Sequence, residues 1–222
     1  MELTSRAELL KVFRVEASFY KSKIGDEYIT HRNQARIIRR GYSGTTPSDA
    51  VVMMVNPGSC NARDKNYNIP TMNPVTDSIP FVEANSDQTQ EQLMRLMEKR
   101  GWKHFVIINL SDICSGNIDV FFSYLRKMKG NVHSILSAER INEMKCVLDN
   151  NRGPVIAAWG TNTRIKQLAK TALNHSLFKP IVGLKHELCP YYLHPRPALI
   201  ENRILWLQKI NTLLEDRDEN TG

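Results

Sequence analysis

Four short apolar segments divide the chain, and each is followed by a longer amphipathic stretch. The apolar segments are AVVMMVN (50–56), HFVIINL (104–110), PVIAAWG (154–160) and KPIVGL (179–184). Their hydrophobicity is continuous rather than alternating, which is typical of parallel strands covered on both faces. We therefore expect four buried strands in a mainly parallel sheet.

The stretches between and after these segments carry apolar residues at helical spacing. We predict helices over residues 86–101, 119–130, 137–151, 161–173 and 197–217. In the helix at 86–101, Ser86 or Asp87 is suited to the N-cap position and Gly101 to the C-terminal end. In the helix at 197–217, Pro197 is suited to the first turn. Strands that alternate with helices predict an α/β fold, here a three-layer α/β/α domain around a central, mainly parallel four-stranded sheet.

The 222 residues suffice for one substantial domain. We expect a single domain over 1–222, made of a helical and basic extension at 1–47 and a core at 48–215. The stretch 57–86 is long and rich in turn residues. A loop of that length inside a compact domain is usually functional.

The formal net charge is +7 at pH 7. Surplus lysine and arginine suit a polyanionic partner such as nucleic acid, although proteins that never bind nucleic acid also reach such values. The densest basic cluster is HRNQARIIRRGY (31–42), with Arg32, Arg36, Arg39 and Arg40. It predicts either a solvated helix or loop face or a patch that grips a phosphate backbone.

No apolar run approaches the ~18 to 20 residues that cross a bilayer, and the charged, amphipathic start lacks a signal-peptide core. We therefore expect a cytoplasmic protein. The four cysteines are scattered without a C-x-x-C pair, which argues against a zinc ribbon and indicates reduced thiols. They are Cys60, Cys114, Cys146 and Cys189. We expect no metal and no cofactor.

Asn56, Asn109 and Trp159-Gly160 stand at the ends of the first three predicted strands, and His194-Pro195 follows the fourth, just before the last helix. In an open parallel sheet, ligands bind outside the carboxyl ends of the strands, so these features should converge. Plainer explanations exist for each. Either asparagine would hydrogen-bond only to neighbouring backbone groups. The Trp-Gly pair would serve packing, and the histidine would be hydrogen-bonded at the start of a helix.

In this order, N-P-G, strand-Asn, strand-Trp-Gly and His-Pro at a helix start, the sequence resembles the uracil-DNA glycosylase superfamily. The N-P-G form is closest to its mismatch-specific, thymine/uracil branch. The ending GLKHELCPYYLHP (183–195) is also similar to that of an uncharacterised family of small bacterial and phage proteins. The resemblance spans residues 48–210 in short islands.

The resemblance implies a DNA glycosylase that flips a nucleotide into its pocket and hydrolyses the N-glycosidic bond, leaving an abasic site. Asn56 would position the attacking water, Asn109 would read the base edge, and His194 would donate to a base carbonyl. The segment HPRPAL would form the wedge, through Arg196, Pro197 and Leu199.

The aromatic that stacks on the base would be Phe81, or else Tyr67, both in the long loop after N-P-G. The residues expected to contact the DNA backbone are Arg36, Arg39, Arg40 and Lys185. No lysine stands at a nucleophile position, which favours a monofunctional enzyme without lyase chemistry. A monomer that acts on a flipped base in duplex DNA, or on a single strand, is the expectation.

One departure from the family concerns Gly58. The strict uracil enzymes begin this turn with an aspartate, and a tyrosine in the place of Gly58 excludes 5-substituted pyrimidines. Asn56 and Gly58 thus predict a weaker water activator and a pocket open to mismatched thymine, 5-hydroxymethyl bases or the modified pyrimidines of phage DNA. The enzyme would then serve base-excision repair or antiviral defence.

Two other functions fit the same residues. A hydrolase or transferase of free nucleotides or nucleosides would keep the pocket without affinity for duplex DNA. A non-catalytic nucleic-acid binder would keep its function when Asn56 and His194 are both changed to Ala.

Overall fold

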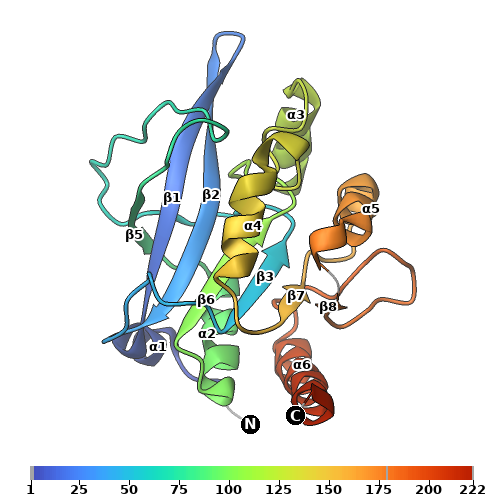
Figure 1. The fold of residues 1–222 in the computed structure, drawn as a ribbon. Coiled ribbons are helices and arrows are strands. Elements are labelled where there is room, and N and C mark those ends of the chain that lie inside the picture. The colour runs from blue at the N-terminus through green and yellow to red at the C-terminus, as the bar shows by residue number, and fades with distance from the viewer. Residues whose placement is uncertain (1–2, 179, 222) are drawn as a thin grey trace.

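The computed structural model describes residues 3–178 and 180–221, and Figure 1 shows its helices and strands. In chain order these are α1 Arg6–Val12, β1 Phe13–Ile24, β2 Glu27–Arg39, β3 Ala50–Met54, β4 Asn61–Ala62, β5 Phe81–Asn85, α2 Gln88–Arg100, β6 His104–Asn109, α3 Ile118–Lys127, η1 Ala138–Arg140, α4 Ile141–Asp149, β7 Val155–Ala157, η2 Thr163–Ile165, α5 Lys166–Asn174, η3 Ser176–Phe178, β8 Ile181–Val182 and α6 Ile200–Thr221.

The strands form one eight-stranded mixed sheet in the order β4-β5-β1-β2-β6-β3-β7-β8. Pairing is antiparallel from β4 to β6 and parallel from β6 to β8. The prediction of a central, mainly parallel four-stranded sheet is therefore wrong. The four expected segments do contain β3, β6, β7 and β8, but they make only one half of the sheet. The first residue of the fourth segment, at position 179, lies outside the described residues.

The other half comes from the N-terminal region, which is not the helical extension expected over 1–47. Strands β1 and β2 form a long hairpin that turns at Gly25, whose φ of 60° suits glycine. Strand β2 also pairs with β6 along Ala35–Ile107 to Ile38–His104. Because β2 lies between β1 and β6, the hairpin is part of the same sheet that carries the parallel strands (Figure 1).

A β-bulge interrupts the hairpin where Ala17 pairs with Ala35 but Phe19 pairs with Arg32. One residue is skipped on β1 and two on β2, so the in-and-out alternation of β2 shifts by one position. Ala35 and Phe19 face the same core. The bulge therefore directs Arg32 to that face.

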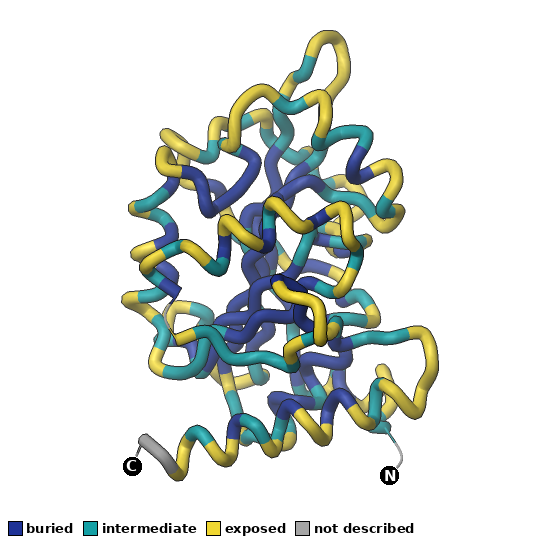
Figure 2. The backbone as a smooth tube through the Cα atoms, turned by 90° about the vertical axis from the view of Figure 1, so that its right-hand side faces the viewer, coloured by how far each residue is buried: buried dark blue, intermediate teal, exposed yellow. Residues whose placement is uncertain are grey.

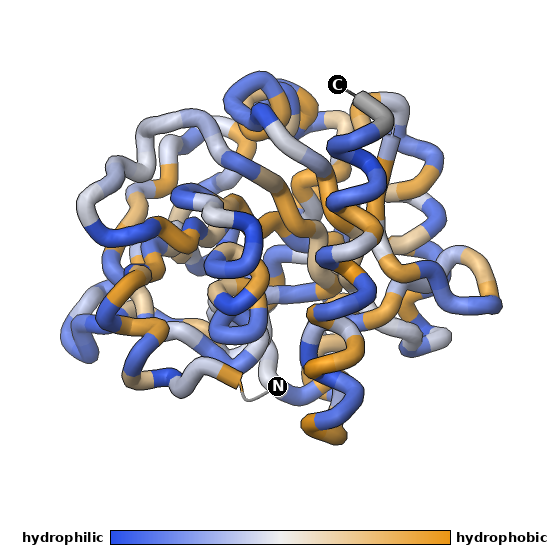
Figure 3. Tube along the Cα trace, turned by 90° about the horizontal axis from the view of Figure 1, so that it is seen from below, coloured by the Kyte–Doolittle hydropathy of each residue, from blue (hydrophilic) through white to orange (hydrophobic). Residues whose placement is uncertain are grey.

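Helices cover both faces of the sheet. On one face α1, α2 and α6 pack over a core that includes Leu9, Met94 and Leu207. On the other, α3, α4 and α5 pack over a second core that includes Phe121, Met144 and Ala169. In Figure 2 the buried strands lie at the centre beneath helices with exposed outer surfaces, and Figure 3 shows hydrophobic and hydrophilic residues alternating along α6.

The predicted helix at 86–101 is confirmed as α2, and its signals act as expected. Asp87 accepts hydrogen bonds from the backbone of Thr89 and Gln90, and Gly101 ends the helix with a φ of 66°. The last helix begins at Ile200, so the placement of Pro197 in its first turn is wrong. Within residues 3–178 and 180–221, no helix is both long and apolar enough to cross a membrane.

Candidate functional site

A small pocket opens beside the carboxyl end of β3, on the face covered by α2. Its volume is about 90 Å³, which corresponds to roughly three waters at ~30 Å³ each. The walls come from the N-P-G turn, the first turn of α2, the floor of the sheet and the segment before α6. The polar and glycine residues that line it include Arg32, Asn56, Gly58, Asp87 and His194.

Asn56 is held by the loop that follows β6. Its Nδ2 donates to the carbonyl oxygens of Ser115, at 2.7 Å, and Ile113, at 3.4 Å. Both donors of the amide are thus directed at backbone carbonyls, which leaves Oδ1 as a hydrogen-bond acceptor. An acceptor in this position is suited to hold a water molecule. Asn56 and His194, which the sequence predicts to converge, both line this pocket.

Asp87 supplies a carboxylate that the sequence-based site did not include. Its Oδ1 caps α2 by accepting from the amides of Thr89 and Gln90, each at 2.9 Å. A Cβ built on Gly58 would lie 3.1 Å from the second oxygen, Oδ2. Oδ2 is therefore close to the N-P-G turn and borders the pocket. A carboxylate is able to act as a general base, which an amide such as that of Asn56 is not.

His194 stands on the opposite wall and is half-buried. Its Nδ1 accepts a hydrogen bond from the backbone N–H of Arg196 at 3.1 Å. Burial lowers the pKa of His194, and the Asp87 carboxylate opposes only part of that effect. The ring is then neutral with its proton on Nε2, so this side chain can donate one hydrogen bond to a ligand.

Arg32 supports the N-P-G turn from below. It is buried, and its Nη1 donates to the carbonyl oxygen of Pro57 at 3.1 Å. Its Nε is buried without a partner among the described residues. The basic cluster at 31–42 thus contributes one residue to the pocket, because the bulge in β2 turns Arg32 toward it.

Asn109 is completely buried on β6, and neither atom of its amide has a partner among the described residues. It lies on the same face of β6 as Phe105 and Ile107, and Ile107 lines the pocket. A buried amide without partners costs free energy unless something else satisfies it. Asn109 is not among the described residues that line the pocket, so the structure does not bring it to the ligand contact expected of it.

Gly58 has a φ of 68°, a conformation that other residues adopt only with strain. Trp159 is buried, and its Nε1 donates to the carbonyl oxygen of Pro190 at 3.0 Å. A Cβ on Gly160 would lie 3.7 Å from Cβ of His194. The Trp159-Gly160 pair thus has the packing role, and it supports the segment that carries His194.

The structure does not bring the expected stacking aromatics to this pocket. Phe81 on β5 lies under the guanidinium of Arg36, 3.5 Å from ring centroid to Cζ, and lines a separate hollow. Tyr67 lines another, with Asp64 and Glu83. Among the described lining residues of the Asn56 pocket, His194 carries the only aromatic ring.

The arginines expected to grip DNA make contacts within the protein. The guanidinium of Arg36 packs on Phe81, as described above. Cζ of Arg39 lies 4.9 Å from the centroid of the Phe13 ring, and Nε of Arg40 donates to the carbonyl oxygen of Leu10 at 3.1 Å. They follow a strand rather than a helix. Each of these three arginines thus has a partner within the protein, and Arg40 remains exposed.

The segment around His194 carries the exposed residues of the expected wedge. Leu199 is 62% exposed just before α6. Arg196 is half-buried, and the carbonyl of Pro197 accepts a hydrogen bond from Nε of Arg203 at 2.9 Å. Lys185 is exposed in the preceding loop, which also carries the exposed Leu188. The chain on either side of His194 thus carries exposed apolar and basic side chains, none of which is among the described lining residues of the pocket.

A buried polar network lies next to the site, beyond the end of β6. Nη1 of Arg140 donates to Oδ2 of Asp112 at 2.5 Å, and the hydroxyl of Tyr20 donates to the same oxygen at 3.1 Å. The other end of the guanidinium bonds Asn33 and Glu143. Complete burial raises the pKa of Asp112 to about 7, and Arg140 offsets only part of this. No motif in the sequence indicates the network.

The described residues contain no group of three or more His, Cys, Asp and Glu side chains arranged to hold a metal ion. Comparison of the chain with known protein families, with curated proteins and with solved structures gives no match.

Proposed function

We propose that the chain is a monofunctional DNA glycosylase that removes a mismatched or modified, 5-substituted pyrimidine and leaves an abasic site. The observation that carries the proposal is the convergence of Asn56, Asp87 and His194 around one small pocket. The three groups supply an acceptor for water, a base and a donor for the leaving group. The reaction would take place in the cytoplasm, with DNA as the partner.

The water lies between Oδ1 of Asn56 and Oδ2 of Asp87 in this mechanism. As the bond from the sugar anomeric carbon to the base nitrogen breaks, the water oxygen bonds to that carbon and Asp87 takes the proton. The base departs with the bonding electron pair, and Nε2 of His194 donates a hydrogen bond to its carbonyl oxygen, where negative charge develops.

The surroundings of the pocket favour DNA over free nucleosides. A flipped base leaves a gap in the duplex that an inserted side chain fills, and the exposed Leu199 is placed to do this beside His194. Gly58 leaves the entrance without a side chain. A pyrimidine with a 5-substituent would enter only if the pocket of about 90 Å³ widens beside Gly58, where the Asp87 carboxylate lies.

The test is incubation of the purified protein with DNA that contains uracil, mismatched thymine, 5-hydroxymethylcytosine or glucosylated phage pyrimidines, followed by alkali to cleave abasic sites. Free deoxynucleosides form a separate arm. We expect strand cleavage on one DNA substrate that is lost in Asp87→Asn and Asn56→Ala. Asp64→Asn, an aspartate that lines a different hollow, is the control. Release of base from deoxynucleosides alone, or no abasic site on any DNA, would contradict the proposal.

A further inference from the structure

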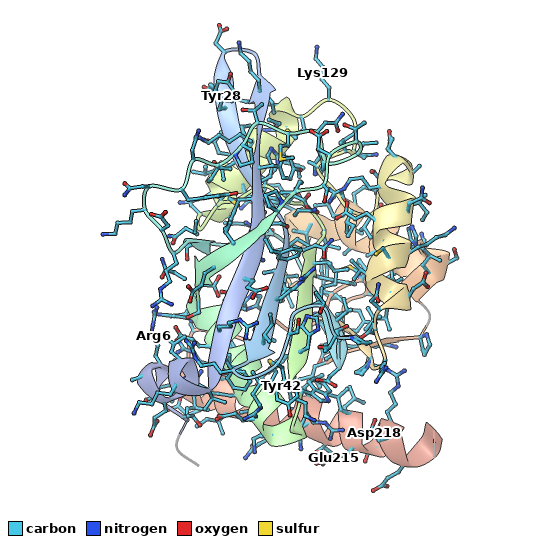
Figure 4. All side chains as sticks on the ribbon, turned by 60° about the vertical axis from the view of Figure 1, so that its left-hand side comes forward. Arg6, Tyr28, Tyr42, Lys129, Glu215 and Asp218 are labelled. Atoms are coloured by element: carbon cyan, nitrogen blue, oxygen red, sulfur yellow. The ribbon has the colours of Figure 1, made fainter. Side chains whose placement is uncertain are left out.

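A much larger cleft lies at the hairpin end of the molecule, and its volume is about 660 Å³. One wall is the end of β1 and the hairpin turn, the second is the loop 71–77, and the third is the segment 127–133 after α3. In Figure 4, Lys129 projects at the same end of the molecule as Tyr28 of the hairpin. The volume is within the ~300–1,000 Å³ typical of small-molecule sites.

The walls are fixed by hydrogen bonds rather than by side-chain packing alone. The amide of Lys21 donates to the carbonyl of Pro70 at 2.8 Å, and the amide of Met72 donates to the carbonyl of Lys21 at 3.2 Å. On the opposite side, Nη1 of Arg140 donates to the carbonyl of Val132 at 3.1 Å. The buried Asp112–Arg140 network thus holds the third wall in place. The cleft is pre-formed.

The rim is cationic. Its four lysines are Lys21, Lys23, Lys127 and Lys129. Lys127 pairs with Glu27 at 2.7 Å. Within the described residues, the other three form no ion pair, and the one lining carboxylate, Asp77, accepts from the amide of Asn73 and the hydroxyl of Thr76. Three lysines are therefore available to an anion.

The floor is polar but uncharged. Tyr20 and His31 stack with ring centroids 4.5 Å apart, and Nε2 of His31 hydrogen-bonds the hydroxyl of Ser22. Burial lowers the pKa of His31 to about 3, and burial lowers the pKa of His133 to about 4. Both rings are neutral at pH 7. A neutral polar floor beneath a cationic rim suits a ligand with an anionic end and a polar, uncharged body.

We propose that this cleft binds a small phosphorylated molecule of nucleotide size. The lysines contact its phosphates, and the Tyr20, Ser22, His31 and His133 side chains face its uncharged part. The cleft shares no lining residue with the Asn56 pocket. The proposal is therefore independent of the proposed glycosylase activity.

Isothermal titration calorimetry on the full chain tests it, with ADP, inorganic pyrophosphate, adenosine and a short single-stranded oligonucleotide as probes. The test variant is Lys21→Ala/Lys129→Ala. The control is Lys166→Ala/Lys170→Ala, which removes the same charge from the exposed side of α5. Thermal unfolding of each variant checks that the fold is unchanged.

We expect ADP and pyrophosphate to bind, and adenosine to bind at least tenfold more weakly because it has no phosphate. The Lys21/Lys129 variant should lose about tenfold or more in affinity, while the control variant and Asn56→Ala bind as wild type does. Equal affinity of wild type and the Lys21/Lys129 variant for ADP would overturn the proposal. So would lysine-dependent binding of the oligonucleotide without binding of ADP, which would assign the rim to a polynucleotide strand.

Discussion

Oδ2 of Asp87 lies 3.1 Å from the position that a Cβ on Gly58 would occupy. The N-P-G turn and the first turn of α2 are therefore in contact, and a side chain on either changes the other. This relationship makes Gly58 a structural requirement of the site as well as an opening in its wall.

Gly58→Ala should destabilise the protein by about 1–2 kcal/mol, because alanine is strained at a positive φ. The added methyl group also crowds the carboxylate, so excision activity should fall by more than the folded fraction does. Urea denaturation and the abasic-site assay on the same sample measure the two effects. Wild-type activity per folded molecule would show that the position of Asp87 is not critical.

The two roles of Asp87 can be separated by substitution. Asparagine retains the N-cap of α2, so Asp87→Asn should change the free energy of unfolding by less than about 0.5 kcal/mol, whereas Asp87→Ala should cost about 1 kcal/mol. Both variants lose the charge and the proton acceptor. We expect both variants to lose excision activity to the same extent. An active Asp87→Asn enzyme would show that the mechanism does not use the carboxylate.

Asp112→Ala should cost about 3–5 kcal/mol, because it leaves the buried Arg140 without its carboxylate partner. Tyr20→Phe removes only one hydrogen bond to Asp112 and should cost about 1–2 kcal/mol. The exposed Lys127–Glu27 pair is the matched control, and Glu27→Ala should cost less than about 1 kcal/mol. Chemical denaturation of the three variants gives the order of their losses in free energy of unfolding. Equal losses would contradict the burial of the Asp112–Arg140 pair.

His133 should make the protein less stable in acid. Burial lowers the pKa of His133 from 6.5 to about 4, so its contribution to stability is complete above pH 6.5 and is lost as the pH falls toward 4. Between these pH values the unfolded chain binds a proton on this histidine and the folded protein does not. The free energy of unfolding therefore falls by about 1.4 kcal/mol for each pH unit. Nδ1 of His133 hydrogen-bonds the hydroxyl of Ser111 at 2.9 Å. An asparagine side chain retains a hydrogen-bonding group there and does not titrate, so the plot of stability against pH for His133→Asn should be flatter by that slope. Parallel curves in a pH series of urea denaturations would refute this.

The parts of the fold that follow from local patterns were predictable. The α2 helix was located because Asp87 and Gly101 mark its two ends, and the parallel strands because their apolar runs are continuous. The β1–β2 hairpin was missed, although apolar residues alternate along 13–19 and Gly25-Asp26 is a two-residue turn signal. The charge of its arginines alone does not indicate a strand, whereas their alternation with other residues does.

The candidate site was predictable only as far as the strand ends determine it. Asn56 and His194 meet because β3 and the segment before α6 end at one edge of the sheet. The sequence predicts either Ser86 or Asp87 as the cap, and no sequence spacing indicates that the second oxygen of Asp87 lies close to Gly58. The direction of Arg32 depends on a bulge, and the pairing of Asp112 with Arg140 depends on how η1 and α4 pack against the sheet. Both are properties of the assembled sheet.

The central position of the β1–β2 hairpin has a consequence for synthesis on the ribosome. The hairpin emerges before β6, the strand that pairs with β2, which begins at His104. At roughly 5–20 residues per second, β2 waits several seconds with its edge unpaired. Chaperones have most access to the nascent chain in that interval, and a shortened chain that lacks the hairpin would leave the edge of β6 open to other chains.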